Sequence, residues 1–449
     1  MSKPDVLVVG GGLAGLAAAA ALGKAGFSVE LLERRPLLGG RATSWEVPGA
    51  DETIDNCQHV LLGCCTNLMD FYTRLGVAAK IRFHSTIAFR TPDARESVVA
   101  ASLLPAPLHL APSLFTFHAF GWKDRWAIAR GMLSMIGDLR RMDAASLDRQ
   151  TMLAWLQAHG QTPQAIDGFW RVVLTSALNE DLERVSAWHG LQVFWKSFAA
   201  SWRAYRVGLP STSLGELYGS PLPNVTVHQR ANVTAIDDGD GTVTTVRTAD
   251  GREWRASAYV LAAPFEVLGE LRPELHVDLE HSPITGIHLW FDRPVLERPF
   301  TALLGRTIQW AFHKPGDPNY VQCVVSASRS LVSTGRQEIV ETAVRELGEF
   351  FPEVRGAQLV KSAVVKEVRA TYSAAAGADA RRPPHETCWS NCWRAGDWVQ
   401  NAWPATMEAA VRSGYRAAEL AAIRLGRPQT FLVPDMPADG LSRWLGVHS

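Results

Sequence analysis

The amino-acid sequence predicts an α/β protein in which a Rossmann-like domain, with a parallel sheet and a β-meander, is interrupted by a mixed α+β domain. Three observations support this prediction. Residues 1–40 alternate strand, glycine-rich turn, helix and strand. Residues 231–264 alternate polar and apolar side chains in short runs separated by Asp-Gly turns, and residues 392–422 repeat the strand-to-helix pattern. Because these stretches lie far apart in the chain, insertions must separate the parts of one domain.

Length, charge and hydropathy narrow the class of protein. At 449 residues the chain is long enough for two interleaved domains. Its 45 basic and 45 acidic residues balance, so the sequence lacks the excess of positive charge that is typical of nucleic-acid-binding proteins. The sequence contains no run of about twenty apolar residues, so no membrane-spanning helix is predicted. The chain enters a strand almost at once, so no signal peptide is expected, and we predict a cytoplasmic protein with reduced cysteines.

The first strand, turn and helix carry a dinucleotide-binding pattern. Gly10, Gly12 and Gly15 form a GxGxxG motif, in which the glycines allow a tight turn, close approach of a pyrophosphate and close helix–strand packing. Glu33 ends the next strand, where a carboxylate binds the adenosine ribose. The helix amino terminus then faces the phosphate charge. The predicted cofactor contacts here are Gly10, Gly12, Leu13, Ala14, Gly15, Glu33 and Arg34.

The segment ERRPLLGGRATSW, residues 33–45, resembles the extension that follows this motif in the amine-oxidase and phytoene-desaturase flavoprotein superfamily. The resemblance implies FAD as the cofactor and a substrate domain inserted into the FAD-binding domain. It places Arg41 close to the phosphates, which suits a guanidinium group. The contacts that the resemblance implies along this stretch and the next are Gly39, Gly40, Arg41, Ala42, Gln58, His59 and Val60.

Two later stretches complete the predicted FAD-binding domain. Near the carboxyl end, the superfamily resemblance implies that Asp397 bonds a ribityl hydroxyl and that a helix from about Pro404 points its positive end at the flavin. Within residues 231–264, it implies a backbone contact from Val233 to adenine. The further contacts predicted in these stretches are Ala263, Pro264, Gly396, Ala405, Thr406 and Met407.

The domain organisation follows from these anchors. The FAD-binding domain is predicted in three parts, 1–85, 211–269 and 386–430. Between them we predict a mainly helical insertion that faces substrate or membrane and a sheet of the substrate domain, followed by a tail. These three segments are 86–210, 270–385 and 431–449.

One stretch of the helical insertion has two interpretations. Apolar residues recur at helical spacing along 125–141, namely Trp126, Ala129, Leu133, Ile136 and Leu139. Arginines accompany them, namely Arg125, Arg130, Arg140 and Arg141. The stretch is either a basic amphipathic helix on an anionic membrane surface or a cavity wall with ordinary surface arginines. Either interpretation suits a lipid substrate.

A narrower resemblance concerns hydroxysqualene dehydroxylases, a branch of this superfamily. Residues 55–68, DNCQHVLLGCCTNL, and residues 396–414, GDWVQNAWPATMEAAVRSG, are similar to two motifs of that branch. The chain departs from the branch pattern at Cys57, at Asn401-Ala402 and at Ala409.

This resemblance implies a reaction and its participants. Reduced FAD replaces the allylic hydroxyl of hydroxysqualene with hydrogen, releasing water and giving squalene for hopanoid and triterpene biosynthesis. The expected partners are an apolar triterpene or isoprenoid substrate, an unidentified electron donor and a peripheral contact with the inner face of the plasma membrane. No nucleic acid and no metal are expected.

The catalytic candidates lie in the two branch motifs. His59 is the first candidate to protonate the leaving hydroxyl, against the alternative of a histidine bonded only to backbone. Gln58 is expected at the flavin rim, and Thr406 and Trp403 are expected to face the substrate, although packing alone explains Trp403 equally well. Further acid candidates are Tyr72, Tyr320 and Tyr372.

Other functions stay open at this point. A carotenoid-type desaturase would transfer hydride from substrate to oxidised FAD, and a lipid carrier would bind without catalysis. Amine oxidases resemble the strand GIHLWFDRPV, but Gly286 stands where they carry a lysine. The cysteines of CQHVLLGCC do not predict a metal site, because Cys64 and Cys65 are adjacent and nothing completes four spaced ligands.

Overall fold

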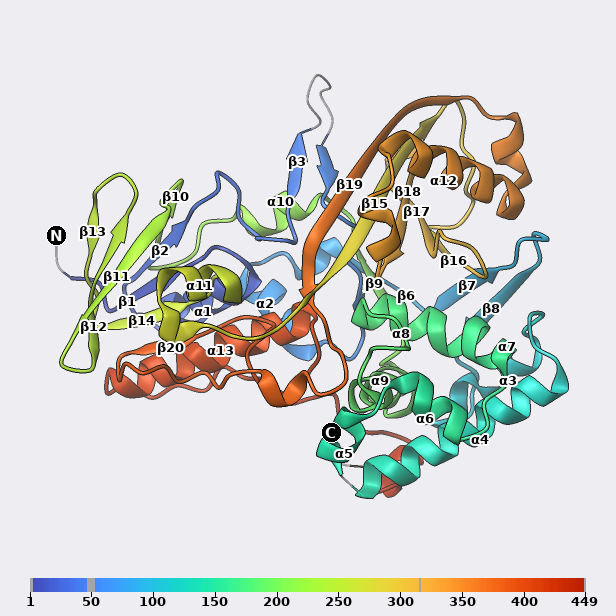
Figure 1. Ribbon diagram of the computed structural model, residues 1–449, viewed down its shortest axis with the longest axis horizontal. Coiled ribbons are helices and arrows are strands. Elements are labelled where there is room, and N and C mark those ends of the chain that lie inside the picture. The colour runs from blue at the N-terminus through green and yellow to red at the C-terminus, as the bar shows by residue number, and fades with distance from the viewer. Residues whose placement is uncertain (1–2, 47–52, 142, 315, 448–449) are drawn as a thin grey trace.

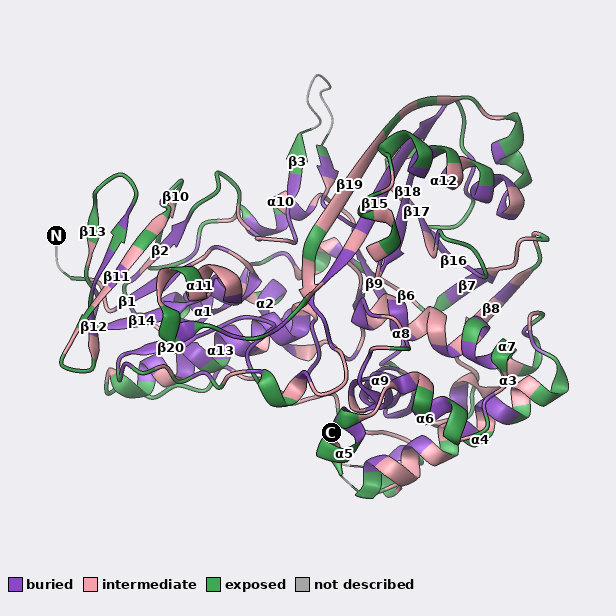
Figure 2. Ribbon diagram, viewed as in Figure 1, coloured by how far each residue is buried: buried purple, intermediate pink, exposed green. Residues whose placement is uncertain are grey.

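The computed structural model describes residues 3–46, 53–141, 143–314 and 316–447. The molecule is elongated (Figure 1): a parallel sheet with its helices lies at one end, and a mixed sheet and a group of helices lie at the other. Burial is concentrated inside each of these layers (Figure 2), so the chain forms several packed cores rather than one. The α/β architecture predicted from sequence, with a parallel sheet, a β-meander and a mixed α+β part, is thereby confirmed.

The parallel sheet is assembled from distant parts of the chain. Its strand order is β10-β2-β1-β14-β20, and every neighbouring pair is parallel. The bounds are β1 Val6–Val9, β2 Val29–Glu33, β10 Val225–Gln229, β14 Ala258–Leu261 and β20 Cys392–Arg394. All four residues of β1 are buried, as a central parallel strand covered on both faces requires.

Two helices pack closely against each other beside this sheet. They are α1, Leu13–Lys24, and α13, Met407–Arg424. A Cβ atom on Gly414 of α13 would lie 2.1 Å from the Ala14 carbonyl oxygen, so only glycine permits this approach. The predicted start of α13 at Pro404 was too early, because the Thr406 hydroxyl accepts the Ala409 N–H and caps the helix there.

The β-meander is smaller than predicted. It contains β11 Val233–Gly239, β12 Thr242–Thr248 and β13 Glu253–Trp254, all antiparallel. The strand that was expected to close it is β14, which leaves the meander and pairs with β1 in the parallel sheet. Its four residues are all buried, and a buried apolar strand is more stable at the centre of a covered sheet than at an edge.

A second sheet has seven strands in the order β19-β15-β18-β17-β16-β7-β8. The bounds are β7 Thr86–Arg90, β8 Glu96–Ala100, β15 His281–Phe291, β16 Phe300–Leu303, β17 Trp310–Lys314, β18 Asp317–Ser326 and β19 Leu359–Tyr372. Two of these strands, β7 and β8, belong to the insertion predicted to be mainly helical. They extend the sheet because β7 pairs with β16 in parallel. One further helix, α12 Arg336–Phe350, packs on this sheet.

The helical region supplies the layer opposite that sheet (Figure 1). Its helices are α3 Ala111–Phe115, α4 Trp122–Arg141, α5 Ala144–Arg149, α6 Met152–Ala158, α7 Pro163–Ala165, α8 Arg171–Leu178 and α9 Ala187–Phe194. Two π-helical turns, Ile166–Trp170 and Trp195–Ala199, extend this group. Three buried tryptophans form much of its core, namely Trp155, Trp170 and Trp195.

Short elements connect the layers. The strands are β3 Ser44–Glu46, β4 Thr53–Asp55, β5 Leu61–Leu62, β6 Ile81–His84 and β9 Val207–Pro210, and the helices are α2 Thr66–Arg74, α10 Leu214–Tyr218 and α11 Phe265–Leu271. The described part of the tail packs back on the body, where the Leu441 N–H donates to the Ala106 carbonyl. Within the described ranges, no helix is both long enough and apolar enough to cross a bilayer.

Candidate active site

A cavity of about 800 Å³ runs from the edge of the parallel sheet into the space between the seven-stranded sheet and the helices. Residues from the GxGxxG turn, the meander and the loop before α13 line one part, and apolar side chains line the other. All the predicted cofactor contacts line this cavity apart from Gly15. A Cβ atom on Gly15 would lie 1.9 Å from the Gly10 carbonyl oxygen, so this glycine serves helix–strand packing.

The turn after β1 is built for close approach of a ligand. Gly10 has φ +108°, and a Cβ atom there would lie 2.7 Å from the Ala262 carbonyl oxygen. At Gly12 a Cβ atom would meet only the Gly40 Cα atom, 3.9 Å away, so the space above the turn is open. At the end of β2, Glu33 is held by the Gly11 N–H at 2.7 Å and the Arg35 N–H at 2.8 Å.

The glycine pair of the extension runs beside this turn. Gly39 forms a parallel bridge with Gly12, and Gly39 and Gly40 both have positive φ. The following Arg41 donates to Asp397 at 2.5 Å and to the Ala370 carbonyl at 2.8 Å. The residues predicted for phosphate and ribityl contacts are therefore ion-paired with each other.

A buried arginine that sequence reasoning missed holds the loop after β20. Arg382 donates to the carbonyl oxygens of Val399 at 2.6 Å, Asn401 at 3.1 Å and Asp397 at 3.2 Å, and pairs with Asp379 at 2.8 Å. Backbone carbonyls that accept a guanidinium carry no sequence signature, so nothing in the chain distinguished Arg382 from its neighbour Arg381.

Burial keeps Cys57 and His59 in their neutral forms. Burial raises the pKa of the Cys57 thiol to about 12, so no thiolate forms at neutral pH. The His59 ring nitrogen Nδ1 lies 2.8 Å from the Cys57 carbonyl oxygen, and that oxygen can only accept. Burial lowers the pKa of His59. At neutral pH His59 therefore lines the cavity with an unprotonated Nε2, and it becomes an acid only at lower pH.

Trp403 and Thr406, which were predicted to face the substrate, both line the cavity but are held by different contacts. Trp403 lines the cavity, donates from Nε1 to Asp435 at 3.2 Å and packs against the Lys196 ammonium, 4.9 Å from the ring centroid. Lys196 also lines the cavity and pairs with Asp435 at 2.6 Å; it was not predicted. The Thr406 hydroxyl is engaged by the Pro404 carbonyl and the Ala409 N–H, and Gln58 lines the cavity.

The three tyrosines proposed as acids do not line this cavity. Tyr72 pairs with the Tyr218 hydroxyl at 3.2 Å, and burial raises the pKa of Tyr72 to about 12. Tyr320 pairs with His288 at 2.6 Å in the core of the sheet, and Tyr372 is buried beside Arg382. The geometry does not favour these proton-donor predictions, because packing turned the tyrosines away from the cavity.

Of the departures from the dehydroxylase pattern, Cys57 alone lines the cavity among the residues described. A Cβ atom on Gly286 would lie 3.4 Å from the Cys57 sulfur, so a longer side chain at position 286 would have to displace it. Asn401 instead bridges the Val399 carbonyl and the Trp403 N–H within the loop, and Ala409 packs in the interior.

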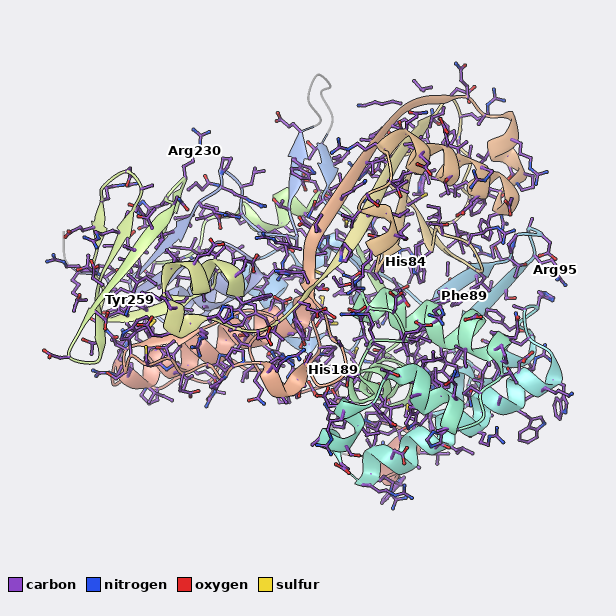
Figure 3. The ribbon with its side chains drawn as sticks, in the orientation of Figure 1. His84, Phe89, Arg95, His189, Arg230 and Tyr259 are labelled. Carbon is purple, nitrogen blue, oxygen red and sulfur yellow. The ribbon has the colours of Figure 1, made fainter. Side chains whose placement is uncertain are left out.

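The rest of the cavity wall is mainly apolar, with a few polar side chains, which include Ser113, Ser176, Asn179, Gln192, Ser197 and Ser326. It lies between the helices and the seven-stranded sheet, where Figure 3 labels Phe89. Its apolar side chains include Phe89, Leu110, Leu114, Phe117, Ile128, Met132, Ile136, Phe169, Val173, Val193, Phe194, Phe198, Ile284, Phe300, Trp310 and Phe312. An apolar enclosure of this size suits a lipid-like ligand and excludes water.

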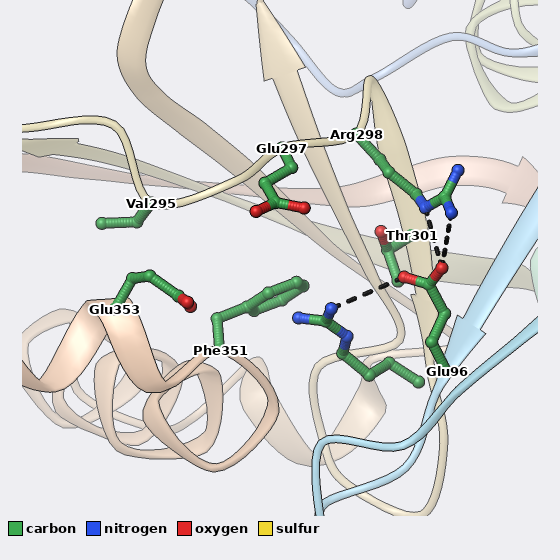
Figure 4. A pocket seen from close by; sticks show the side chains of 8 residues that line it. Glu96, Val295, Glu297, Arg298, Thr301, Phe351 and Glu353 are labelled. Carbon is green, nitrogen blue, oxygen red and sulfur yellow. Dashed lines mark hydrogen bonds and ion pairs between the residues drawn. The ribbon is translucent and has the colours of Figure 1, made fainter.

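A second hollow is too small for a substrate. It measures about 30 Å³, and Arg90 and Arg298 there both pair with Glu96 (Figure 4). Its volume is about that of one water molecule in the liquid. The ion pair between Arg298 and Glu96 ties β8 to the segment before β16. In the described residues, no three His, Cys, Asp or Glu side chains are placed to hold a metal ion.

Comparison with known proteins places this architecture among flavoproteins. The family described as flavin containing amine oxidoreductase matches residues 13–422. The chain is 25% identical to the probable zeta-carotene desaturase of Synechococcus elongatus, covering 92% of this chain and 98% of that protein. It is 26% identical to the 15-cis-phytoene desaturase of Narcissus pseudonarcissus, covering 92% and 79%.

Solved structures share the fold at lower identity. An oxidoreductase from Methanosarcina mazei superposes with a TM-score of 0.70 at 18% identity, covering 92% of this chain and all of that one. A putrescine oxidase triple mutant superposes with a TM-score of 0.72 at 16% identity, covering 95% and 99%. These likenesses support the fold.

Proposed function

The chain belongs to the flavin containing amine oxidoreductase family and is an FAD-dependent oxidoreductase, and we propose that its substrate is a long apolar isoprenoid. The observation that carries the substrate class is the continuity of one cavity. Its dinucleotide end opens directly into an apolar enclosure, with no charged side chain of the helical layer other than Lys196 in the described lining. An amine or sugar substrate would need more polar partners there.

The residues present fit FAD. Open space above Gly12 would accept the pyrophosphate, and Glu33 retains free lone pairs for the ribose after its two backbone contacts. Arg41 and Asp397, which pair with each other and line the cavity, would hold the phosphates and the ribityl chain, and Thr406 at the α13 amino terminus lines the same cavity. Bound flavin would supply or accept a hydride.

We propose reductive removal of the allylic hydroxyl of hydroxysqualene as the specific reaction. The C–O bond breaks, the hydroxyl leaves as water with one proton, and a hydride forms the new C–H bond. Support comes from the two segments that resemble dehydroxylases, since Gln58 and His59 of the first line the same cavity as Trp403 to Met407 of the second. We further propose that an unidentified partner supplies the electrons.

Two groups of the chain would act on the hydroxyl. The unprotonated Nε2 of His59 can accept the hydroxyl hydrogen and orient the substrate, and the protonated ring can donate a proton to the departing oxygen. The apolar wall excludes water that would capture a developing allylic cation, and aromatic side chains such as Phe169 and Phe194 can stabilise positive charge.

Desaturation of a carotenoid-like substrate is the second candidate. It is favoured by the relatives that match nearly the whole chain, which are named as carotene and phytoene desaturases. The same cavity would serve, but hydride would leave the substrate instead of entering it. A carrier without catalysis ranks below both because the groove and the apolar enclosure form one space.

Anaerobic mixing separates these functions. We expect the reduced holoprotein to convert hydroxysqualene to squalene and the absorbance of oxidised flavin to return. Mass spectrometry identifies the product. Bleaching of the oxidised holoprotein by phytoene or zeta-carotene alone would instead establish a desaturase. An unchanged flavin spectrum in both directions, together with tight triterpene binding, would contradict both enzymatic proposals.

A further inference from the structure

The outward face of α4 carries exposed apolar side chains. Successive helix residues are rotated by about 100°, so Trp122, Trp126 and Leu133 lie on one stripe, opposite the buried Ile128 and Met135. These three side chains are 62%, 59% and 71% exposed, and the two indole rings contact each other edge to face. The helix is thus apolar on both faces, although only one face packs against the domain.

Further exposed apolar side chains lie in the segment that precedes α4 in the chain. Leu103, Leu104 and Leu108 precede α3, and Phe115 ends it; all four are exposed. We define the mouth surface as Leu103, Leu104, Leu108, Phe115, Trp122, Trp126 and Leu133. A monomeric soluble surface rarely groups so many large apolar side chains, and such groups mark protein or membrane contacts.

Two residues of the mouth surface also belong to the cavity. Leu108 and Leu133 are both exposed to solvent and part of the cavity lining. Ala129, Met132 and Ile136 of α4 line the cavity as well. One flank of α4 is therefore a cavity wall, while Trp122 and Trp126 do not line the cavity and are exposed to solvent.

The charges beside the stripe are basic. On α4 five basic residues accompany two acidic ones, and Lys123, Arg130 and Arg141 are exposed. Both acids are engaged by the protein, since Asp124 accepts from Thr162, and Asp138 accepts from the Trp155 indole N–H and pairs with Arg141. Lys123 and Arg130 are therefore exposed cations without an acidic partner among the described residues of α4. An apolar stripe that extends about 17 Å from Trp122 to Leu133, with a basic flank, complements an anionic lipid surface.

We propose that the mouth surface docks on an anionic lipid bilayer, so that an apolar substrate enters the cavity from the membrane without crossing water. The route rests on the proposed isoprenoid substrate, whereas the docking itself rests only on the exposed residues. A helix lying in the interface buries its tryptophans at the headgroup level, where an apolar ring with an N–H donor is stable.

Vesicle binding by the full-length holoprotein tests the docking without substrate or turnover. We expect cosedimentation with vesicles of phosphatidylcholine and phosphatidylglycerol, and weaker binding to phosphatidylcholine alone. Trp122→Ser/Trp126→Ser should lower the partition coefficient at least about tenfold. Lys123→Gln should lower it about fivefold, only on anionic vesicles.

A matched control uses exposed apolar residues elsewhere. Trp45→Ser/Val360→Ser removes a 42% exposed tryptophan and a 67% exposed valine from β3 and β19, which lie away from α4 (Figure 1). This control should bind vesicles like the unchanged protein, and every variant should retain the flavin absorbance that reports folding. Three results would overturn the proposal. The Trp122→Ser/Trp126→Ser variant could bind vesicles as well as the unchanged protein, or the unchanged protein could bind no vesicles at all. The unchanged protein could also form a dimer in solution that this variant fails to form.

Discussion

At the scale of single residues, the environment of His59 decides what chemistry it can perform. Its Nδ1 is committed to the Cys57 carbonyl at 2.8 Å, and burial lowers its pKa below the ordinary 6.5. A role as proton donor therefore requires the minor, protonated form at neutral pH. A role in orienting the substrate hydroxyl requires only the neutral ring.

The pH dependence of turnover separates these two roles. If His59 donates the proton, the single-turnover rate of the reduced holoprotein should rise as pH falls toward a pKa below 6.5. His59→Gln should then slow the step by about 100-fold or more and remove the pH dependence. Stopped-flow flavin absorbance measures both effects, and FAD affinity serves as the control because Gln can still donate to the Cys57 carbonyl. A rate independent of pH and of this substitution would eliminate His59 as the acid.

At the scale of elements, one buried carboxylate joins α13 to α2. Glu408 in the first turn of α13 accepts the Asn67 N–H at 3.1 Å and the Leu68 N–H at 2.8 Å, both in the first turn of α2. It also pairs with Arg412 at 2.7 Å and is fully buried. Because α2 follows the loop with Gln58 and His59, this contact couples the two walls of the flavin end of the cavity.

Substitution of this carboxylate should destabilise the pair of helices. The two backbone N–H groups bond different carboxylate oxygens, so Glu408→Gln places its NH2 donor against at least one of them, and we expect the free energy of unfolding to fall by about 1–3 kcal/mol. Urea denaturation of the holoprotein measures the change. Glu338→Gln, an exposed acid in the first turn of α12, is the matched control and should change stability by less than about 0.5 kcal/mol. Equal effects of the two substitutions would contradict the coupling.

At the scale of the whole molecule, buried neutral histidines make the fold sensitive to acid. Burial lowers the pKa of His189 and of His288 to about 4. His189 lies where the helical region meets the segment before β20 (Figure 3), and His288 lies inside the seven-stranded sheet. Below the unfolded value of 6.5, the unfolded chain binds protons that the native chain excludes, so stability is lost as pH falls from 6.5 toward 4.

Each histidine should contribute about 3 kcal/mol to this loss once both states have titrated. We expect the urea midpoint of the holoprotein to fall steeply between pH 6.5 and pH 4, and His189→Gln to flatten that slope. The quantity to compare is the slope of the urea midpoint against pH, because the substitution also changes stability at neutral pH. His118→Gln, at an exposed position, should leave the slope unchanged. A slope that is the same for both variants would contradict this origin of the acid sensitivity.

Local patterns determined the cofactor end of the protein. The GxGxxG turn, the glycine pair at 39–40 and Glu33 are conformational requirements that can be read from neighbouring residues, and so are the strands and helices around them. The dinucleotide-binding turn was therefore predictable from local patterns, and the resemblance to the flavoprotein superfamily supplied FAD. All the predicted contacts apart from Gly15 line the cavity, because the turn and the extension beside it belong to one recognisable motif.

Long-range packing decided what local patterns did not contain. The addition of β7 and β8 to the sheet, the loop contacts of Arg382 and the position of Lys196 depend on partners far away in the chain. The same holds for α4, whose helical period was evident while its two faces were not. Sequence by itself determined the dinucleotide turn and the strands and helices next to it, because those depend on neighbouring residues. The tertiary structure alone decided which side chains face the cavity and which face solvent, because burial depends on every element that packs around a residue.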